Sequence, residues 1–298
     1  MSQSYESAVS RLNNIETIKP LLSALRTLSM GAWQMALNKL ASMGPYEESF
    51  EQILFEILRH LDITALPKEK QSPQEALEDK TIILIIGTER GLCGKYNTIL
   101  AENTMRWVKE QDFSAYEIWA IGSRLIKVLD RMDIPIAWRK PIPVGGLLSY
   151  QESYITTQSW LDRYEAYEFN QLFIHFNQIQ KGGFYQFSTF KLLPYQSPEL
   201  STKNEDTSHK WPPPIIESDP IRIYRQIIEH NIASSYFKLL LSSSAAENSS
   251  RYRLMQEAEE NAEEIIEELT QVINAERKRK ITQEMQELAT GAGLLDRN

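Results

Sequence analysis

The chain has 298 residues, a formal net charge of −8 and a hydrophobic content of 42%. That hydrophobic content is enough to bury a core and excludes an intrinsically disordered chain. The acidic balance disfavours general binding to nucleic acid, whose phosphates attract basic surfaces. The single cysteine, Cys93, excludes a disulfide within the chain.

A membrane-spanning or secreted protein is not expected from the sequence. The longest aliphatic run, at residues 82–86, is far shorter than the roughly 20 apolar residues that cross a bilayer. The first residues lack the basic and apolar regions of a secretory signal. We therefore expect a protein of a reducing, cytosol-like compartment with no membrane span.

Two helices are predicted at the start of the chain, over residues 6–43 and 46–61, separated by Gly44 and Pro45. Pro20 conflicts with the first helix, because an interior proline removes a hydrogen bond and predicts either a kink or the true helix start. Apolar residues recur along this helix at steps of three and four, which is the period of one helix face. They are Val9, Leu12, Ile15, Leu22, Leu25, Leu28, Ala32, Met35 and Ala36.

An α/β domain with a largely parallel sheet is predicted over residues 80–195, after a linker at 66–79. Its first strand is a continuous apolar run, as in parallel sheets that are covered on both faces. Gly182 and Gly183 predict a hairpin between the last two strands. The proline- and glycine-rich residues 135–146 predict a loop. The expected strands are 81–87, 117–121, 171–178 and 184–193, and the expected helices are 97–111, 123–132 and 150–167.

The C-terminal segment, residues 219–298, is predicted to be helical, after a polar, proline-rich loop at 196–218. Between residues 247 and 288 it contains no glycine or proline, so it predicts a helix of about 40 residues, roughly 60 Å long. A narrow apolar seam on so long a helix requires a partner helix. The seam residues are Leu254, Ala258, Ile265, Leu269 and Val272, followed by Ile281, Met285 and Leu288.

The N-terminal segment, residues 1–62, is the partner that the chain itself can offer to this seam. We therefore expect a fold of the α/β class with long helices. The N- and C-terminal helices would pair as an antiparallel coiled coil, with a Rossmann-like α/β domain inserted between them.

The glycine loop at residues 87–95 has the strand–loop–helix order of a phosphate-binding site. It lacks the Walker pattern, because Glu89 stands at the position of the first glycine and Tyr96 follows the lysine. A nucleotide-binding enzyme and a tight strand-to-helix turn are both open interpretations of this loop. Cys93 is interpreted as a small buried residue rather than a reactive thiol. The four histidines are scattered without metal-binding spacing, so no catalytic, cofactor or metal site is predicted.

Two charge clusters lie on the last helix. Seven glutamates between residues 257 and 268 are interpreted as a solvated face. Four adjacent cations at 277–280 interrupt the apolar seam and point around most of the helix circumference. This arrangement suits a helix end inserted into a charged or polar sleeve formed by other subunits.

Three segments resemble the gamma subunit of F-type ATP synthases, the rotating central stalk. Gly91 to Asn97, with Cys93 and Gly94, is similar to the G-L-C-G-x-[YF]-N loop that follows the first strand of that family. Residues 246–262 resemble its S-E-x-x-x-R-x-x-A-M-x-x-A-x-x-N-A stretch. Residues 274–292 resemble its N-x-x-R-Q-x-x-I-T-x-E-x-x-E-I-x-x-G-A ending. The architecture of the family is the one inferred above.

The chain also departs from the family pattern. The family's N-terminal K-I-T-x-A-M is replaced by residues 20–25, which begin with Pro20, and its R-Q pair is Arg277 and Lys278 here. The sequence around Glu247 is closer to the alternate, sodium-type bacterial branch. The redox insert of photosynthetic gamma subunits, with its cysteine pair, is absent because Cys93 stands alone.

The resemblance implies a non-catalytic rotor subunit that couples ion-driven rotation to ATP synthesis or hydrolysis, without a cofactor. The coiled coil would occupy the bore of the alpha/beta hexamer. The α/β domain would contact the epsilon subunit and the membrane rotor ring, on the cytoplasmic side of an energy-coupling membrane. The residues implied to face partner subunits are Leu25, Arg277, Lys278, Thr282 and Glu284.

An alternative is a gamma-like paralogue that regulates or scaffolds the complex without rotating. Pro20 and Lys278 motivate this alternative, because both depart from the family pattern on the helices that would rotate.

Overall fold

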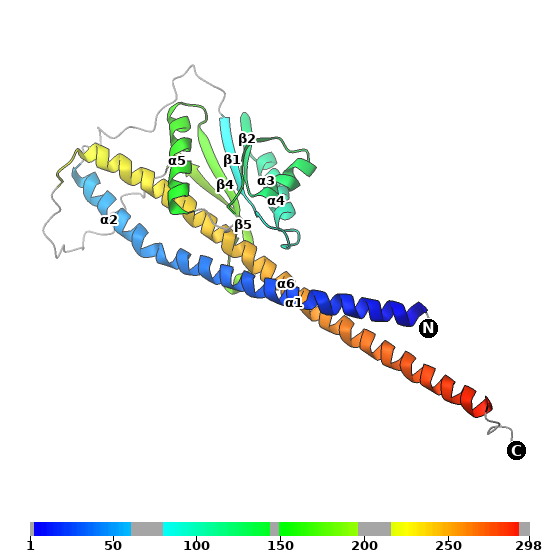
Figure 1. Ribbon diagram of the computed structural model, residues 1–298. Helices are drawn as coiled ribbons and strands as arrows, with labels where there is room; N and C mark the ends of the chain where they lie inside the picture. The colour runs from blue at the N-terminus through cyan, green and yellow to red at the C-terminus, as the bar shows by residue number, and fades with distance from the viewer. Residues whose placement is uncertain (1–2, 61–79, 144–148, 196–215, 292–298) are drawn as a thin grey trace. The chain divides into compact units, whose positions relative to one another are not determined.

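The computed structural model describes residues 3–60, 80–143, 149–195 and 216–291. The chain forms two compact units, one made of residues 1–31 and 251–298 and the other of residues 32–250. Two long helices, α1 (Gln3–Ser42) and α6 (Pro220–Gly291), run from one unit into the other (Figure 1). The linker at 66–79 and most of the loop at 196–218 lie outside the described residues.

The larger unit is built on a five-stranded sheet in the order β3-β2-β1-β4-β5. The first four strands in this order run parallel, and β5 pairs antiparallel with β4. This sheet confirms the predicted α/β fold with a largely parallel sheet. The strands are β1 (Lys80–Ile86), β2 (Ala115–Ile121), β3 (Ile136–Lys140), β4 (Gln171–Ile179) and β5 (Tyr185–Leu193).

The continuous apolar sequence of β1 is explained by helices on both faces of the sheet. Ile83 and Ile85 pack in a core with α3 (Tyr96–Glu110) and α4 (Ser123–Arg131). Ile82, Leu84 and Ile86 face the other core, which α5 (Tyr150–Glu165) and α6 complete. Figure 1 shows α5 on one side of the sheet and α3 and α4 on the other. Both faces of the central strand are therefore buried.

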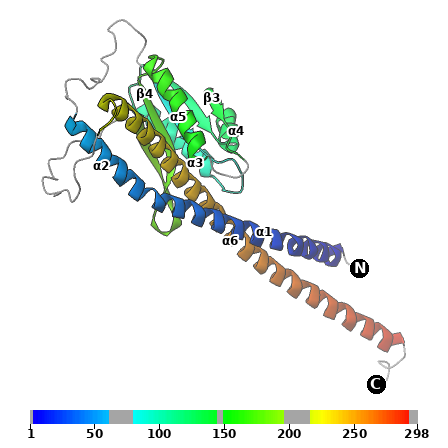
Figure 2. The same ribbon diagram turned by 60° about the vertical axis from the view of Figure 1, so that its left-hand side comes forward.

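The helix α2 (Gly44–His60) follows α1 after a break at Met43, and the predicted breaking residues Gly44 and Pro45 form its first turn, where proline is tolerated. Leu54 and Ile57 of α2 are buried against Ile227 of α6. Figure 2 shows α2 beside the first turns of α6. This contact gives the start of α6 a second partner besides the sheet.

The smaller unit contains the predicted antiparallel pairing of the chain's two ends. Lys19 forms an ion pair with Glu263 at 2.8 Å, and Arg26 forms one with Glu259 at 3.1 Å. The residue number of the partner on α6 falls from 263 to 259 as the residue number on α1 rises from 19 to 26, so the two helices run in opposite directions. The buried side chains of this unit include Ala8, Ser29, Met255, Ala262 and Ile273.

Pro20 lies inside α1 without ending it, and the helix continues for many residues on either side. Its side chain and that of Glu16 are exposed. The Glu16 carbonyl, which loses its usual donor at position 20, therefore lies at the exposed side of the helix, where water can satisfy it.

The apolar seams predicted from sequence are wrong at six positions. Leu28, Met35 and Val272 are each at least half exposed, at 69%, 56% and 50%, and so are Ile281, Met285 and Leu288 at the end of α6. On α1 the apolar stripe is wider than the face that one partner helix covers. On α6 the buried residue is Ile273, which is about five full turns after Met255 at about 3.6 residues per turn. A strict 3.5-residue spacing moves the seam one position away from this face.

The loop predicted at residues 135–146 is wrong over β3. This strand has only alternate residues partly buried, and Pro135 and Pro141 stand immediately outside it. Proline is tolerated at the ends of an edge strand, because no backbone N–H is needed there for hydrogen bonds between strands. The prolines that predicted a loop therefore mark the boundaries of a short edge strand.

The core between the sheet, α5 and α6 is centred on Trp160, which is 2% exposed. Its ring centroid lies 4.8 Å from that of Tyr236 on α6 and 5.9 Å from that of Trp119 on β2. Each such aromatic pair contributes about 0.5–1.5 kcal/mol beyond its area burial. Trp160 therefore joins three elements at one point.

We expect Trp160→Ala to lower the free energy of unfolding by about 3–5 kcal/mol, because it leaves a large cavity in this core. Urea unfolding followed by circular dichroism measures the change. Ile155→Ala on the same helix is the control, since Ile155 is 60% exposed and its loss should change stability by less than about 0.5 kcal/mol. Equal effects of the two substitutions would contradict this account.

Candidate functional site

The glycine loop after β1 is held by a buried residue at the start of α3. The Asn97 side chain is 6% exposed. Its Oδ1 accepts from the Thr88 backbone N–H at 3.0 Å, and its Nδ2 donates to Thr88 Oγ1 at 2.8 Å. Cys93 is buried against Tyr96 and Ala246 of α6. The predicted buried position of Cys93 is confirmed.

The glycines of this loop have different roles. Gly94 has a positive φ of 58°, a conformation that favours glycine. A Cβ on Gly87 would lie 2.4 Å from Cβ of Leu125, so Gly87 allows β1 and α4 to approach closely. A Cβ on Gly91 would meet Arg124 at an ordinary 3.6 Å. Close packing, rather than a phosphate cradle, accounts for Gly87.

The Glu89 carboxylate lies at the N-terminus of α4, a position that favours an anion in any helix. Its Oε2 accepts from the Ser123 and Ile142 backbone N–H groups, each at 2.9 Å, and Oε1 accepts from Ser123 Oγ at 2.6 Å. Burial raises the pKa of Glu89, but these hydrogen bonds outweigh it and hold the pKa below its ordinary value. The chain's own carboxylate therefore fills this anion position.

Tyr96 anchors the loop to α6, a role that its sequence position did not indicate. Its hydroxyl donates to the Ser243 carbonyl at 3.2 Å, and its ring lies 4.9 Å from that of Tyr185 on β5. Burial raises the pKa of Tyr96 above its ordinary range, so the hydroxyl stays protonated. The aromatic position in the G-L-C-G-x-[YF]-N pattern was the signal in the sequence.

The end of α6 places the four partner residues suggested on this helix on one exposed segment. Every residue from 277 to 288 is exposed, including Arg277, Lys278, Thr282 and Glu284. Thr282 Oγ1 donates to the Lys278 carbonyl at 2.9 Å, and Glu284 lies 3.7 Å from Lys280. These contacts lie within the helix, so the outward surface of the segment stays accessible.

Apolar side chains on this segment are also exposed. Ile281, Met285 and Leu288 are 50%, 65% and 73% exposed, and they continue the apolar face of the helix. A contiguous apolar surface of this kind, flanked by charges, marks an interaction site. Leu25 is not part of this segment: it is half-buried on α1, next to the Arg26–Glu259 ion pair.

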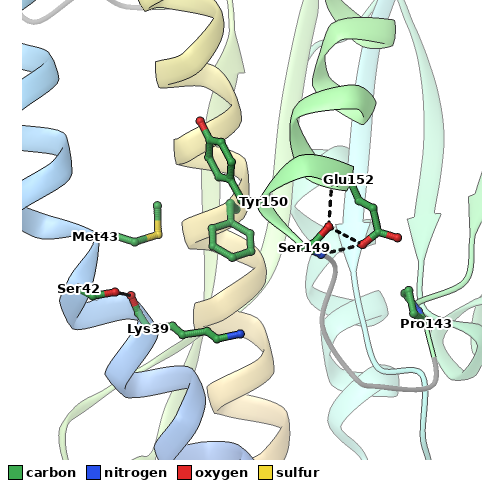
Figure 3. Close-up of a pocket in the computed structure, with 8 residues that line it drawn as sticks. Lys39, Ser42, Met43, Pro143, Ser149, Tyr150 and Glu152 are labelled. Atoms are coloured by element: carbon green, nitrogen blue, oxygen red, sulfur yellow. Dashed lines mark hydrogen bonds between the residues drawn. The ribbon is translucent and has the colours of Figure 1, made fainter.

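A cavity of about 450 Å³ lies in the larger unit between α1, α5 and α6 (Figure 3). Three of its polar side chains bond groups at the ends of helices. Ser149 and Glu152 form a capping box at the start of α5, and Ser42 Oγ donates to the Lys39 carbonyl at 2.8 Å. The lining residues are Lys39, Ser42, Met43, Pro143, Ser149, Tyr150, Glu152 and Phe237.

Within the described parts of the chain, no three histidine, cysteine, aspartate or glutamate side chains are grouped as metal ligands. In the same residues, no helix is long and apolar enough to span a membrane.

We expect Glu89→Gln to lower the free energy of unfolding by about 1 kcal/mol at neutral pH, because charged hydrogen bonds in a partly exposed site are screened. The folded pKa of Glu89 is lowered, so the stabilisation is present above the ordinary glutamate pKa of 4.5 and is lost as the pH falls through the folded pKa. Urea unfolding of both proteins from pH 7 to pH 3 measures this difference. Glu102→Gln, at an exposed position of α3, is the control. A difference that grows on acidification would contradict the assignment.

The chain matches known proteins along nearly all of its length. The family model described as ATP synthase matches residues 4–295. An ATP synthase gamma chain from Geotalea uraniireducens (strain Rf4) is 25% identical over 293 residues, covering 97% of this chain and 98% of the relative. The ATP synthase gamma chain of Geotalea daltonii is 27% identical, with the same coverage.

Solved structures share the fold at lower sequence identity. A chain of the Euglena gracilis mitochondrial ATP synthase, in a structure of OSCP/F1/c-ring in rotational state 3, has a TM-score of 0.61 and 14% identity. This match covers 99% of our chain and 95% of that one. A chain of the central stalk/c-ring structure of the Tetrahymena thermophila mitochondrial ATP synthase has a TM-score of 0.55 and 16% identity, covering 80% and 99%. Because the family match spans almost every residue and these relatives are gamma chains, the chain belongs to the ATP synthase gamma-chain family.

Proposed function

We propose that this chain is the central-stalk gamma subunit of an F-type ATP synthase. It would couple ion-driven rotation to ATP synthesis or hydrolysis in a hexamer of alpha and beta subunits. The observation that carries the proposal is the exposed end of α6, where apolar residues and four cations share one continuous helical segment. A helix with such a surface requires a surrounding partner.

The partner contacts follow from the same segment. Arg277, Lys278, Thr282 and Glu284 would face the beta subunits, with Ile281 and Met285 against the apolar wall of the bore. Rotation would bring these side chains to each catalytic site in turn. Coupling is then a difference in contact free energy between rotational states.

A role without catalysis is supported by the loop after β1. Glu89 occupies the anion position at α4, and Gly87 is required by the close packing of Leu125. The chain would therefore bind no ATP itself, and the alpha/beta hexamer would carry the catalytic sites. We place the chain peripherally in a membrane ATP synthase on its cytoplasmic side, with the α/β domain against the epsilon subunit and the rotor ring.

The alternative of a non-rotating paralogue finds no support at Pro20. Pro20 was one of the two residues that motivated this alternative, but α1 passes through this position as a continuous helix. Lys278 is exposed on the same segment as the other suggested partner residues and can contact a partner as a cation.

Co-expression with cognate alpha and beta subunits tests the proposal. We expect a purified complex that contains one copy of this chain and hydrolyses ATP, because a central stalk has one site per hexamer. Native mass spectrometry gives the stoichiometry. Failure to co-purify, under conditions in which an established gamma subunit assembles, would falsify the proposal.

The apolar surface of the α6 end has a prediction of its own. Ile281→Asp should lower ATP hydrolysis by the complex about tenfold, or about 1.4 kcal/mol, because it places a charge against an apolar wall. Circular dichroism of the free chain should not change, since Ile281 is 50% exposed. Gln283→Asp adds the same side chain at an exposed polar position of the segment and is the matched control. Equal activity of the two variants would show that Ile281 contacts no partner.

A further inference from the structure

The turn between β4 and β5 makes a close contact with α6 that the family match does not explain. The turn is a short 3₁₀ segment, Lys181–Gly183, in which Gly182 and Gly183 have positive φ values of 74° and 76°. Gly183 is buried, and its carbonyl accepts a hydrogen bond from the hydroxyl of Ser249 on α6. Ser249 is itself fully buried. The tip of the hairpin is therefore docked on the helix rather than exposed to solvent.

A second hydrogen bond joins the same hairpin to α6. The backbone N–H of Ile179, at the end of β4, donates to Ser242 Oγ at 3.3 Å. Ser242 and Ser249 are separated by about two helical turns, or roughly 10 Å along the axis. Two attachment points this far apart add to the core packing of α6 on the sheet and resist both sliding and rotation of the hairpin along the helix.

The helix α1 closes the other side of the turn. A Cβ built on Gly183 would lie 2.6 Å from two carbons of the Trp33 ring and 2.7 Å from Ser249 Oγ. Both distances are shorter than the non-bonded contacts that a Cβ atom makes in folded proteins. Gly183 therefore fills the space between Trp33 of α1 and Ser249 of α6 without room for a methyl group.

These contacts lie near the ends of the larger unit in sequence. Trp33 and Ser249 are within two residues of the boundaries of that unit, at Ala32 and Ser250. Beyond them, α1 and α6 continue as uninterrupted helices. The hairpin therefore contacts both helices close to where they leave the unit.

We propose that Ile179, Gly183, Trp33, Ser242 and Ser249 form a torsional clamp, through which the α/β domain transmits torque to both stalk helices. This inference rests on the rotor function proposed above and adds the residues that make the connection stiff. A contact that served folding alone would affect stability, whereas a clamp also sets the angular stiffness between the α/β domain and the far end of α6.

The test measures that stiffness in the assembled alpha/beta complex. The hexamer is fixed to a surface and arrested with a non-hydrolysable ATP analogue. A bead is attached through Gln111→Cys, an exposed position after α3, and its angular fluctuations are recorded. Angular variance is inversely proportional to stiffness. Ser249→Ala removes one of the two described hydrogen bonds between the hairpin and α6. We expect the variance to rise by less than about twofold, because Ser243 also bonds the Ile86 carbonyl and α6 packs on the sheet. ATP hydrolysis should stay unchanged, because the end of α6 is untouched.

Gly183→Ala and Gly182→Ala form a matched pair. Both place alanine at a positive φ, with the same backbone strain. The added Cβ at Gly182 meets only the ring of Phe184, at 3.6 Å, whereas at Gly183 it meets Trp33 and Ser249. Gly183→Ala should raise the angular variance, and Gly182→Ala should leave it at the parent value. Ser188→Ala, which loses a bond to Gln178 within the hairpin, is the matched control for Ser249→Ala.

The outcomes separate the clamp from the proposed function. If the unmodified chain does not assemble with the alpha and beta subunits, the rotor function fails and the clamp fails with it. If it assembles but Ser249→Ala gives the same variance as Ser188→Ala, the clamp alone is overturned. This comparison stands even if Gly183→Ala does not fold, because Ser249→Ala introduces no clash.

Discussion

The uninterrupted course of α6 (Pro220–Gly291) is the constraint on which the rest of the molecule depends. Most of the stability of a protein helix comes from tertiary packing, so the packing partners of α6 change along its length. Within the larger unit it is buried against the sheet through Ile232, Tyr236 and Leu240. Burial of each such side chain contributes about 1.5–3 kcal/mol. Within the smaller unit it pairs with α1. The last described turns remain exposed.

The composition of α6 changes with the partner of each part. Where it packs on the sheet and hairpin, small residues such as Ser243, Ala246 and Ser249 are buried, and they allow strands and loops to approach the helix closely. Where it pairs with α1, the sequence of α6 mixes glutamates with apolar residues. Glu263 and Glu259 form ion pairs with Lys19 and Arg26 of α1. Where it carries the four cations, its apolar side chains face solvent. Along its length α6 therefore first packs on the sheet, then pairs with α1, and finally presents an exposed surface.

The α/β domain has the topology of a nucleotide-binding fold, but its local chemistry differs. The N-terminus of α4, which favours an anion, is occupied by Glu89, and three hydrogen bonds fix its carboxylate there. The loop that would enclose a ligand instead packs Cys93 and Tyr96 against α6. In this chain the glycine loop and the sheet thus serve to hold a helix.

Much of this fold was predictable because its signals are local. The apolar run of β1, the two-glycine hairpin and the unbroken C-terminal helix each depend on neighbours in sequence. The strand β3 was missed because Pro135 and Pro141 carry a loop signal that edge strands tolerate. Periodicity also could not tell which edge of a wide apolar stripe is covered, so Leu28 was assigned to the wrong environment.

Some residues of the candidate sites could likewise be predicted from local sequence, whereas others could not. The exposed cations of α6 were evident as a charge run, and the family resemblance singled out the glycine loop. The anchoring role of Tyr96 and the contact of Gly183 with Ser249 join residues far apart in sequence. Such pairs leave no periodic signal in a single sequence and emerge only from the packing of α6 on the sheet.

Direct observation of rotation tests the central claim that the chain is a rotor. A probe on the α/β domain is followed in a surface-fixed complex with alpha and beta subunits while ATP is supplied. We predict rotation in one direction, with three pauses per turn, because the hexamer presents three equivalent catalytic sites. Steady ATP hydrolysis by a complex whose probe does not turn would contradict this account.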